Sequence, residues 1–301
     1  MPHSVIPHLS YIKGVRAGSR EAMPEAFRLR LEHVDEVLAE GKDPVARIQT
    51  IFGAPMEVDL REEVSRSLYV YGSFEDDLVA AFSRLLRPGA VFVDIGAHYG
   101  FFSLWAATLV GPEGAVISFE PTPDTAERLR RNLGPFETST VNAAAVWDAD
   151  ETLSFNTFDV SWSAFNSYTS IRAPDDMDTP APVLVEVPAL RLDSYFAEAE
   201  RGPDVIKIDA ESAELNVLRG AEAVLAAYRP IVTIEVGDYP HLVDAGVPNS
   251  CEILGWIQDR DYVLFEPGLE RETPHVLRGP LEYGYQNIVC VPAERLTGLM
   301  A

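Results

Sequence analysis

Residues 90–100, which read AVFVDIGAHYG, decide the fold of this chain. An apolar run over 90–93 ends at an acid, Asp94, and glycines follow at positions 96 and 100. This order predicts a buried strand, a tight turn and the start of a helix, because glycine allows the backbone to turn sharply and to approach a ligand closely. The free N–H groups at such a helix start suit a carboxylate or a phosphate. The stretch therefore predicts a ligand-binding turn at the carboxyl end of a strand.

Outward from this turn, apolar strands alternate with amphipathic helices. Six further strands are expected over 115–119, 138–146, 204–209, 230–236, 262–265 and 287–291. Helices are expected over 99–110, over 124–133 and from the end of the 204–209 strand to residue 225. The alternation is typical of βαβ units with right-handed crossovers. It predicts an α/β, Rossmann-like fold with a seven-stranded, mostly parallel sheet and helices on both faces.

The rest of the chain divides into an extension and an insertion. Residues 1–55 are expected to be a partly helical N-terminal extension, with a loose lead-in over 1–20 and a helix within 21–50 that stops near Gly41. Residues 56–301 are expected to be the main domain, with extended structure over 56–71 and a helix from the acidic cap at 73–77 to residue 86. Within it, an insertion over about 151–188 carries two edge-type strands and a polar loop. Such an insertion is often a lid or a binding element.

Composition excludes several function classes. The chain holds 47 acids against 24 lysines and arginines, a formal charge of −23, so neither nucleic acid nor an anionic membrane is expected as a partner. Two cysteines, Cys251 and Cys290, cannot form a disulfide framework. With no long apolar run and no signal-like segment, the expected location is the cytoplasm and the expected partner a small molecule. A homodimer remains open.

Acids stand at the ends of four expected strands: Asp94, Glu120, Asp209 and Glu235. Ligands of an open parallel sheet bind beyond the carboxyl ends of its strands, so these side chains are candidates for a site. Glu120 follows Gly100 by 20 residues and could accept both hydrogen bonds of a ribose diol. Dinucleotide-binding proteins use the same arrangement, but the third glycine of their fingerprint is missing here.

A family resemblance rests on several short motifs that occur in order between Val58 and Glu235. They are DIGAHYG at 94–100, FEPTP at 119–123, VNAAAV at 141–146 and IKIDAESAE at 206–214, with GSFE at 72–75, LD at 192–193, LRG at 218–220 and RP at 229–230. Together they resemble FkbM-type S-adenosylmethionine-dependent methyltransferases. The resemblance implies a class I methyltransferase fold and O-methylation of a sugar, polyketide or other secondary metabolite. Three positions depart from the family pattern: His98 replaces Asn, Tyr99 replaces Ile or Leu, and Ser212 replaces Gly.

The resemblance also implies a cofactor site. The turn at 96–100 would hold the methionyl end of S-adenosylmethionine, Glu120 the ribose, and the end of the third strand the adenine. The expected cofactor-binding residues are Asp94, Gly96, Ala97, His98, Tyr99, Gly100, Glu120, Pro121, Asn142, Ala143, Ala144 and Val146.

Catalytic candidates follow the fourth and fifth strands. Lys207, Asp209 and Glu211 share one side of an extended segment, which brings the two acids toward a reaction centre and gives the lysine a carboxylate partner. Asp209, Glu211 or His241 could act as the base or orient the acceptor. Carboxylates also suit Mg²⁺, and Asp209, Glu235 and Asp238 are the candidate ligands, so metal-dependent and metal-free mechanisms both remain open. The expected acceptor-binding residues are Tyr71, Phe74, Glu75, Ser163, Asn166 and Ser167.

Two other functions would fit part of the same sequence pattern. An NAD(P)-dependent oxidoreductase would use Gly96 and Glu120 but needs a third glycine and a Tyr-Lys or His constellation, which the sequence lacks. A non-catalytic scaffold with a methyltransferase fold would have an occluded acceptor cleft.

Overall fold

The computed structural model describes residues 5–19, 22–169 and 180–296. Its centre is an eight-stranded sheet with the order β12-β11-β13-β10-β9-β3-β4-β5. The strands of this sheet are β3 (Val91–Ile95), β4 (Ala115–Phe119), β5 (Ser139–Asn142), β9 (Val205–Ile208), β10 (Ile231–Val236), β11 (Tyr262–Glu266), β12 (Thr273–Pro274) and β13 (Gln286–Pro292). All seven predicted strands are present, and the two-residue β12 extends the sheet at its edge.

The sheet is mostly parallel, as expected. β5, β4, β3, β9 and β10 pair in parallel, whereas β13 lies antiparallel to β10 and β11. Every residue of β3, β9 and β10 is buried, which explains their continuous apolar runs, because both faces of a parallel sheet are covered. The strand expected over 138–146 is shorter in the structure. It ends at Asn142, and Ala145–Val146 form β6 in another sheet.

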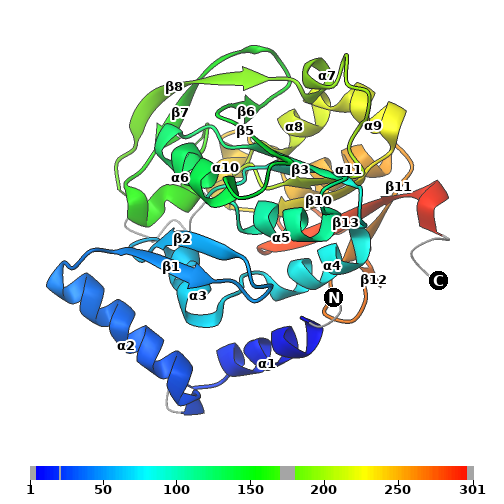
Figure 1. The fold of residues 1–301 in the computed structure, drawn as a ribbon. Helices are drawn as coiled ribbons and strands as arrows, with labels where there is room; N and C mark the ends of the chain where they lie inside the picture. The colour runs from blue at the N-terminus through cyan, green and yellow to red at the C-terminus, as the bar shows by residue number, and fades with distance from the viewer. Residues whose placement is uncertain (1–4, 20–21, 170–179, 297–301) are drawn as a thin grey trace.

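Two layers of helices bury the faces of the sheet (Figure 1). One apolar core joins the sheet to α4 (Asp76–Leu85), α5 (Phe101–Val110) and α6 (Pro123–Leu133). The other joins it to α7 (Leu192–Tyr195), α8 (Glu214–Gly220), α9 (Glu222–Tyr228) and α11 (Ser250–Gln258). The short α10 (Pro240–Asp244) follows β10, and a 3-10 turn, η4 (Ala293–Arg295), follows β13. The fold is therefore an α/β/α sandwich, as the alternation of strands and helices predicted.

The N-terminal part is more regular than the sequence suggested. The expected loose lead-in contains a helix, α1 (Ile6–Ala17), which packs on α4 and buries Leu9 and Ile12. The expected helix is α2 (Glu25–Glu40), and Gly41 ends it in the left-handed conformation. The segment 56–71 is extended only at its start, because β2 (Pro55–Asp59) gives way to α3 (Glu63–Tyr71). β1 (Val45–Gln49) pairs with β2, so the boundary expected between residues 55 and 56 falls inside a β-hairpin.

The two strands of the insertion join β6 in a separate small sheet, in the order β6-β8-β7. β7 (Glu151–Thr157) pairs antiparallel with β8 (Val183–Leu190), and these are the two predicted edge-type strands. A 3-10 helix, η3 (Val160–Phe165), forms part of the predicted polar loop between these strands, and residues 170–179 of that loop lie outside the described residues. Of the helices described, none combines the length and the apolar character needed to cross a bilayer.

Candidate active site

The turn after β3 is built around one glycine that no other residue can replace. Gly96 has φ +74°, and a Cβ atom there would lie 1.7 Å from the carbonyl oxygen of Asp209. Gly100, with φ +90°, lies against the Leu129 side chain of α6, and a Cβ atom there would lie 2.5 Å from that side chain, so the glycine lets α6 approach. The N–H groups of Gly96 and Ala97 both donate to the carbonyl of Phe119. The turn is therefore locked between the ends of β4 and β9.

Glu120 lies beside this turn with its carboxylate buried. Its Oε2 atom accepts the N–H of His98 at 3.1 Å, and Oε1 accepts the N–H of Thr122 at 3.0 Å. The Thr122 side chain also hydrogen-bonds this carboxylate, whose remaining acceptor capacity a ribose hydroxyl can use. Burial raises the pKa of Glu120 to about 7, against the effect of the two N–H donors, which lower it. The group is poised to titrate near neutral pH.

One pocket begins at this turn and runs across the carboxyl edge of the sheet. From the cofactor prediction it is lined by Gly96, His98, Tyr99, Glu120, Pro121, Ala144 and Val146, and from the acceptor prediction by Phe74, Ser163 and Asn166. η3 closes one side, because Ser163 Oγ lies 3.2 Å from Nε2 of His98 and Asn166 donates to Thr122 Oγ1. The insertion thus contributes to the pocket wall, as its length suggested.

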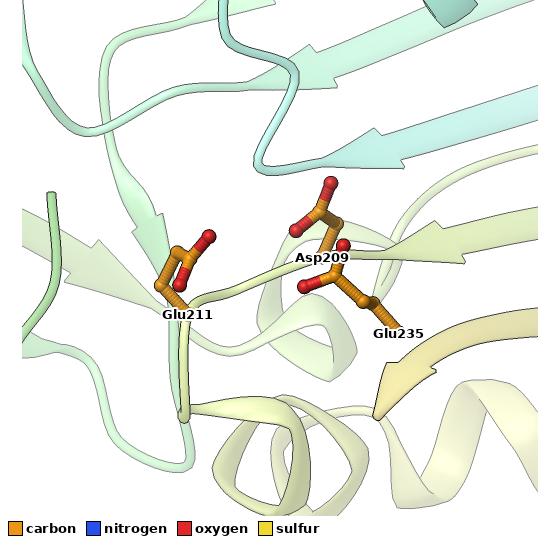
Figure 2. Close-up of side chains that lie close together, drawn as sticks. All are labelled: Asp209, Glu211 and Glu235. Atoms are coloured by element: carbon orange, nitrogen blue, oxygen red, sulfur yellow. The ribbon is translucent and has the colours of Figure 1, made fainter. Parts of the chain in front are cut away.

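Three carboxylates that line the pocket gather at the ends of β9 and β10 (Figure 2). Asp209 follows β9, Glu211 stands two residues later, and Glu235 belongs to β10. Their nearest carboxylate oxygens lie within 4.8 Å of one another. Glu211 and the following Ser212 have φ +46° and +79°, a conformation that costs non-glycine residues energy and that turns the chain back toward the sheet. Ser212 therefore adopts the left-handed backbone that the family's glycine would take.

Lys207 ties this acidic end to the first strand. Its Nζ atom lies 2.8 Å from Oδ2 of Asp209 and 3.7 Å from Oδ1 of Asp94, with the side chain 3% exposed. Burial would lower the pKa of this lysine, but Asp209 and Asp94 outweigh it and hold the pKa above its usual value. The lysine therefore stays charged and is occupied by two carboxylates.

A second layer of polar groups lies behind the carboxylates. Glu75, at φ +48° before α4, accepts a hydrogen bond from Asn287 at 2.6 Å, and the Tyr285 hydroxyl lies 3.4 Å from the same oxygen. The Tyr285 hydroxyl is also hydrogen-bonded to Glu235. Burial and the nearby Asp209 raise the pKa of Glu75 to about 7. Tyr285 lines the pocket, whereas Glu75 lies behind it.

Several predicted residues are not part of the pocket lining. Asp94 is buried behind the turn, where Oδ2 accepts a hydrogen bond from Ser103. Tyr71, at the end of α3, packs against Arg16 and Phe27 of the N-terminal part and does not line the pocket. The remaining predicted residues outside the lining are Ala97, Gly100, Asn142, Ala143, Ser167, His241 and Asp238.

The metal and base predictions change accordingly. Asp238 accepts two hydrogen bonds from Ser250 and borders a separate small hollow, so Glu211 takes its place in the acidic group. His241 lies on α10, outside the pocket lining, whereas Asp209 and Glu211 lie within it. Three carboxylates are a ligand set that Mg²⁺ can use, although Lys207 already neutralises one of them.

The pocket also contains residues that sequence reasoning missed. Tyr285 gave no signal, because it lies in an irregular stretch before β13, far from every motif. Trp147 lines the pocket, and its ring meets that of Tyr168 edge-on, with the ring centroids 4.6 Å apart. This pairing depends on the insertion packing against the residues around Trp147. Glu62 lines it too, but its carboxylate caps α3 by accepting the N–H groups of Val64 and Ser65. A strongly acidic helix start was the available signal for that cap.

Comparison with known proteins gives a family match. The model of the methyltransferase FkbM domain matches residues 94–264. The chain is 29% identical over 161 residues to 2-O-methyltransferase NoeI of Sinorhizobium fredii, covering 50% of this chain and 65% of that protein. It is also 29% identical over 222 residues to the AMB antimetabolite synthetase AmbE of Pseudomonas aeruginosa, covering 61% of this chain and 10% of that protein. The chain therefore spans a tenth of AmbE and just under two thirds of NoeI.

Solved structures give weaker likenesses. A methyltransferase FkbM from Methylobacillus flagellatus aligns with a TM-score of 0.41 and 14% identity, covering 74% of this chain and 52% of that one. The O-methyltransferase TomG from Streptomyces achromogenes, in complex with S-adenosylmethionine, aligns with a TM-score of 0.38 and 14% identity, covering 71% of this chain and 78% of that one.

Proposed function

We propose, from the premise that this chain belongs to the methyltransferase FkbM domain family, that it uses S-adenosylmethionine to methylate a hydroxyl group of a small molecule. One observation carries the proposal: a single pocket joins the Gly96 turn and Glu120 to the carboxylates of Asp209, Glu211 and Glu235. A cofactor site and an acidic reaction end therefore share one cavity. The named activity of NoeI, a 2-O-methyltransferase, supports oxygen as the methylated atom.

The residues present fit the cofactor. The lack of a Cβ atom at Gly96 lets the end of β3 lie against the carbonyl of Asp209, and both residues line the pocket, so backbone at the ends of β3 and β9 borders the space for the methionyl group. Glu120 offers two carboxylate oxygens to the ribose diol, and the apolar walls at Pro121, Ala144 and Val146 suit adenine. When bound, S-adenosylmethionine supplies an electrophilic methyl group.

The acidic end can position the acceptor and take up its proton. As the acceptor oxygen bonds to the methyl carbon, the carbon–sulfur bond breaks and the hydroxyl proton must leave. Asp209 and Glu235 offer carboxylates for that proton, and alignment of the two substrates supplies most of the rate enhancement in such a displacement. Lys207 holds Asp209 in one orientation through the 2.8 Å ion pair, which favours a metal-free role for that carboxylate.

Ligand binding tests this proposal against its rivals. Calorimetry should show that S-adenosylmethionine and S-adenosylhomocysteine bind at micromolar strength and that NAD and NADP do not. Glu120→Ala should weaken both adenosyl ligands by about 30-fold to 100-fold, because two charge-assisted hydrogen bonds are lost. Binding of NAD in preference to S-adenosylhomocysteine would favour an oxidoreductase. Binding of neither ligand would favour a scaffold.

A further inference from the structure

The pocket wall supplied by the chain before β3 is largely apolar. Met56, Val64, Leu68 and Phe74 line it from β2, α3 and the turn before α4. Two rings from the first turn of α5 complete this surface, which we call the apolar compartment: Met56, Val64, Leu68, Phe74, Phe101 and Phe102. All of these side chains belong to, or pack against, the core that joins the sheet to α4, α5 and α6.

Phe102 places the apolar compartment beside the acidic end of the pocket. The Nζ atom of Lys207 lies 5.2 Å from the centroid of the Phe102 ring and 2.8 Å from Oδ2 of Asp209. Phe101 meets Phe102 edge-on, with the ring centroids 5.2 Å apart. An acceptor whose hydroxyl lies at Asp209 can therefore rest the remainder of its surface against these rings.

Two polar side chains line the same wall, and they differ in what they offer a ligand. Both carboxylate oxygens of Glu62 already accept a backbone N–H, from Val64 and from Ser65. Ser65 is 1% exposed, and within the described residues its Oγ atom has no hydrogen-bond partner. A buried hydroxyl without a partner costs free energy, which a bound ligand can restore. Ser65 is therefore the polar anchor of this wall.

This composition favours one of the acceptor classes over another. A sugar carries a hydroxyl on almost every ring carbon, and each hydroxyl that is buried without a partner costs free energy. The wall before β3 meets such a molecule with apolar side chains and one unpaired hydroxyl. An apolar ring instead removes its own surface and that of the compartment from water, and aromatic rings gain further from edge-on packing.

We infer that the acceptor is a hydroxylated aromatic compound rather than a sugar, that its ring lies against the apolar compartment, and that Ser65 receives its one further polar group. The inference rests on the proposed function, because it assigns the acceptor class of the same pocket. It makes β2 and α3 the elements that determine specificity, and both precede the residues that match the family model, 94–264.

A pair of probes tests the acceptor class. Titrated by calorimetry into the chain saturated with S-adenosylhomocysteine, 2-naphthol should bind at least tenfold more tightly than methyl α-D-glucopyranoside. Phe74→Ala should weaken 2-naphthol about tenfold, because the ring loses an aromatic contact. Val64→Ala, at a second half-buried position, should weaken it by about threefold. Phe136→Ala is the matched control: Phe136 is also half-buried against the same core but lies outside the pocket lining. All three variants should keep their S-adenosylhomocysteine affinity.

A second hydroxyl on the same ring tests Ser65. Of 2,6-dihydroxynaphthalene and 2,7-dihydroxynaphthalene, at least one should bind about fivefold more tightly than 2-naphthol, because it pairs the unpaired hydroxyl. Ser65→Ala should remove this gain and leave the affinity for 2-naphthol unchanged. Urea unfolding of Ser65→Ala without ligand should show no loss of stability, since the hydroxyl has no partner to lose. A purely structural serine would instead lower stability and leave the gain intact.

The outcomes separate the two proposals. If S-adenosylhomocysteine does not bind the native chain, the proposed function fails. If it binds, but 2-naphthol does not bind or the glucoside binds as tightly, the aromatic inference fails alone. It also fails if neither Phe74→Ala nor Val64→Ala weakens 2-naphthol, because the ring then lies elsewhere. Diols with no advantage over 2-naphthol, or an advantage that survives Ser65→Ala, would overturn the assignment of Ser65.

Discussion

The α-carbon of Gly96 faces the carbonyl oxygen of Asp209 so closely that a Cβ atom would lie 1.7 Å from it. These residues follow neighbouring parallel strands, β3 and β9, which pair from Phe92 with Val205 to Ile95 with Ile208. The contact joins the expected cofactor turn to the expected reaction end through backbone alone. A change at either residue therefore affects the other.

Gly96→Ala should disrupt both stability and cofactor binding. The added methyl group forces β3 and β9 apart at their ends, and we expect a loss of about 3 kcal/mol in the free energy of unfolding. Gly89→Ala is the matched control, because Gly89 also has positive φ, +84°, but open space around its α-carbon. That variant should lose only about 1 kcal/mol. Urea unfolding measures both, and equal losses would show that the contact with Asp209 is unimportant.

The core of the fold was predictable because its signals are local. β3, β9 and β10 are fully buried runs, and each precedes an acid or a glycine turn that ends it. The N-terminal part gave weaker signals. α1 begins at Ile6 without a side-chain cap, and its burial depends on packing against α4. Tertiary contacts, rather than local pattern, decide such a helix.

The residues of the candidate site also differ in whether a local sequence signal or a tertiary contact places them. Glu120 and Asp209 stand at strand ends, so topology alone brings them to one edge of the sheet. Tyr285 reaches the pocket only because β13 inserts antiparallel between β10 and β11, and no periodicity in the sequence reports that insertion. His241 and Asp238 follow β10 closely in sequence, but both lie outside the pocket lining, and no local pattern in the sequence reports that position.

Cofactor affinity should rise with pH up to about 7. The ribose hydroxyls donate to the ionised form of Glu120, whose pKa is about 7 in the free chain, so binding below that pH must first release a proton. Affinity should therefore fall about tenfold for each pH unit below 7. 5′-Methylthioadenosine is the suitable probe between pH 5.5 and 7.5, because it has the ribose but no amino acid that titrates. Glu120→Gln should bind weakly and without this slope. A flat profile in the native chain would place the ribose elsewhere.

Stability should fall as pH rises between about 4.5 and 7, and Glu75 should cause part of the fall. Its pKa is about 7 in the folded chain and 4.5 in the unfolded one, so the folded state binds more protons in this window. A raised pKa gives stability that is present at low pH and lost as pH rises through 7. Glu120 adds a change of the same sign.

Glu75→Gln isolates this contribution. The variant cannot ionise, so relative to the native chain it should gain about 2 kcal/mol in unfolding free energy on going from pH 5 to pH 8. The amide oxygen can still accept the hydrogen bond from Asn287. Urea unfolding at the two pH values checks it, with Glu270→Gln as the exposed control. If the variant and the native chain lose stability in parallel, Glu75 is ionised throughout and its burial has no such effect.

Asp209→Asn should lower turnover by at least about 100-fold and leave cofactor affinity nearly unchanged, because this carboxylate orients the acceptor hydroxyl or takes its proton. Asp244→Asn, on the exposed side of α10, is the matched control and should remain active.

Treatment with EDTA should not affect the native chain, since Lys207 lies 2.8 Å from Asp209 and supplies the positive charge that a metal would bring. Methyl transfer from labelled S-adenosylmethionine measures all three. Loss of activity in EDTA, its return with Mg²⁺, and a Glu235→Gln variant as impaired as Asp209→Asn would instead assign the carboxylates to a metal. A fully active Asp209→Asn variant would contradict both mechanisms and leave alignment of the two substrates as the source of catalysis.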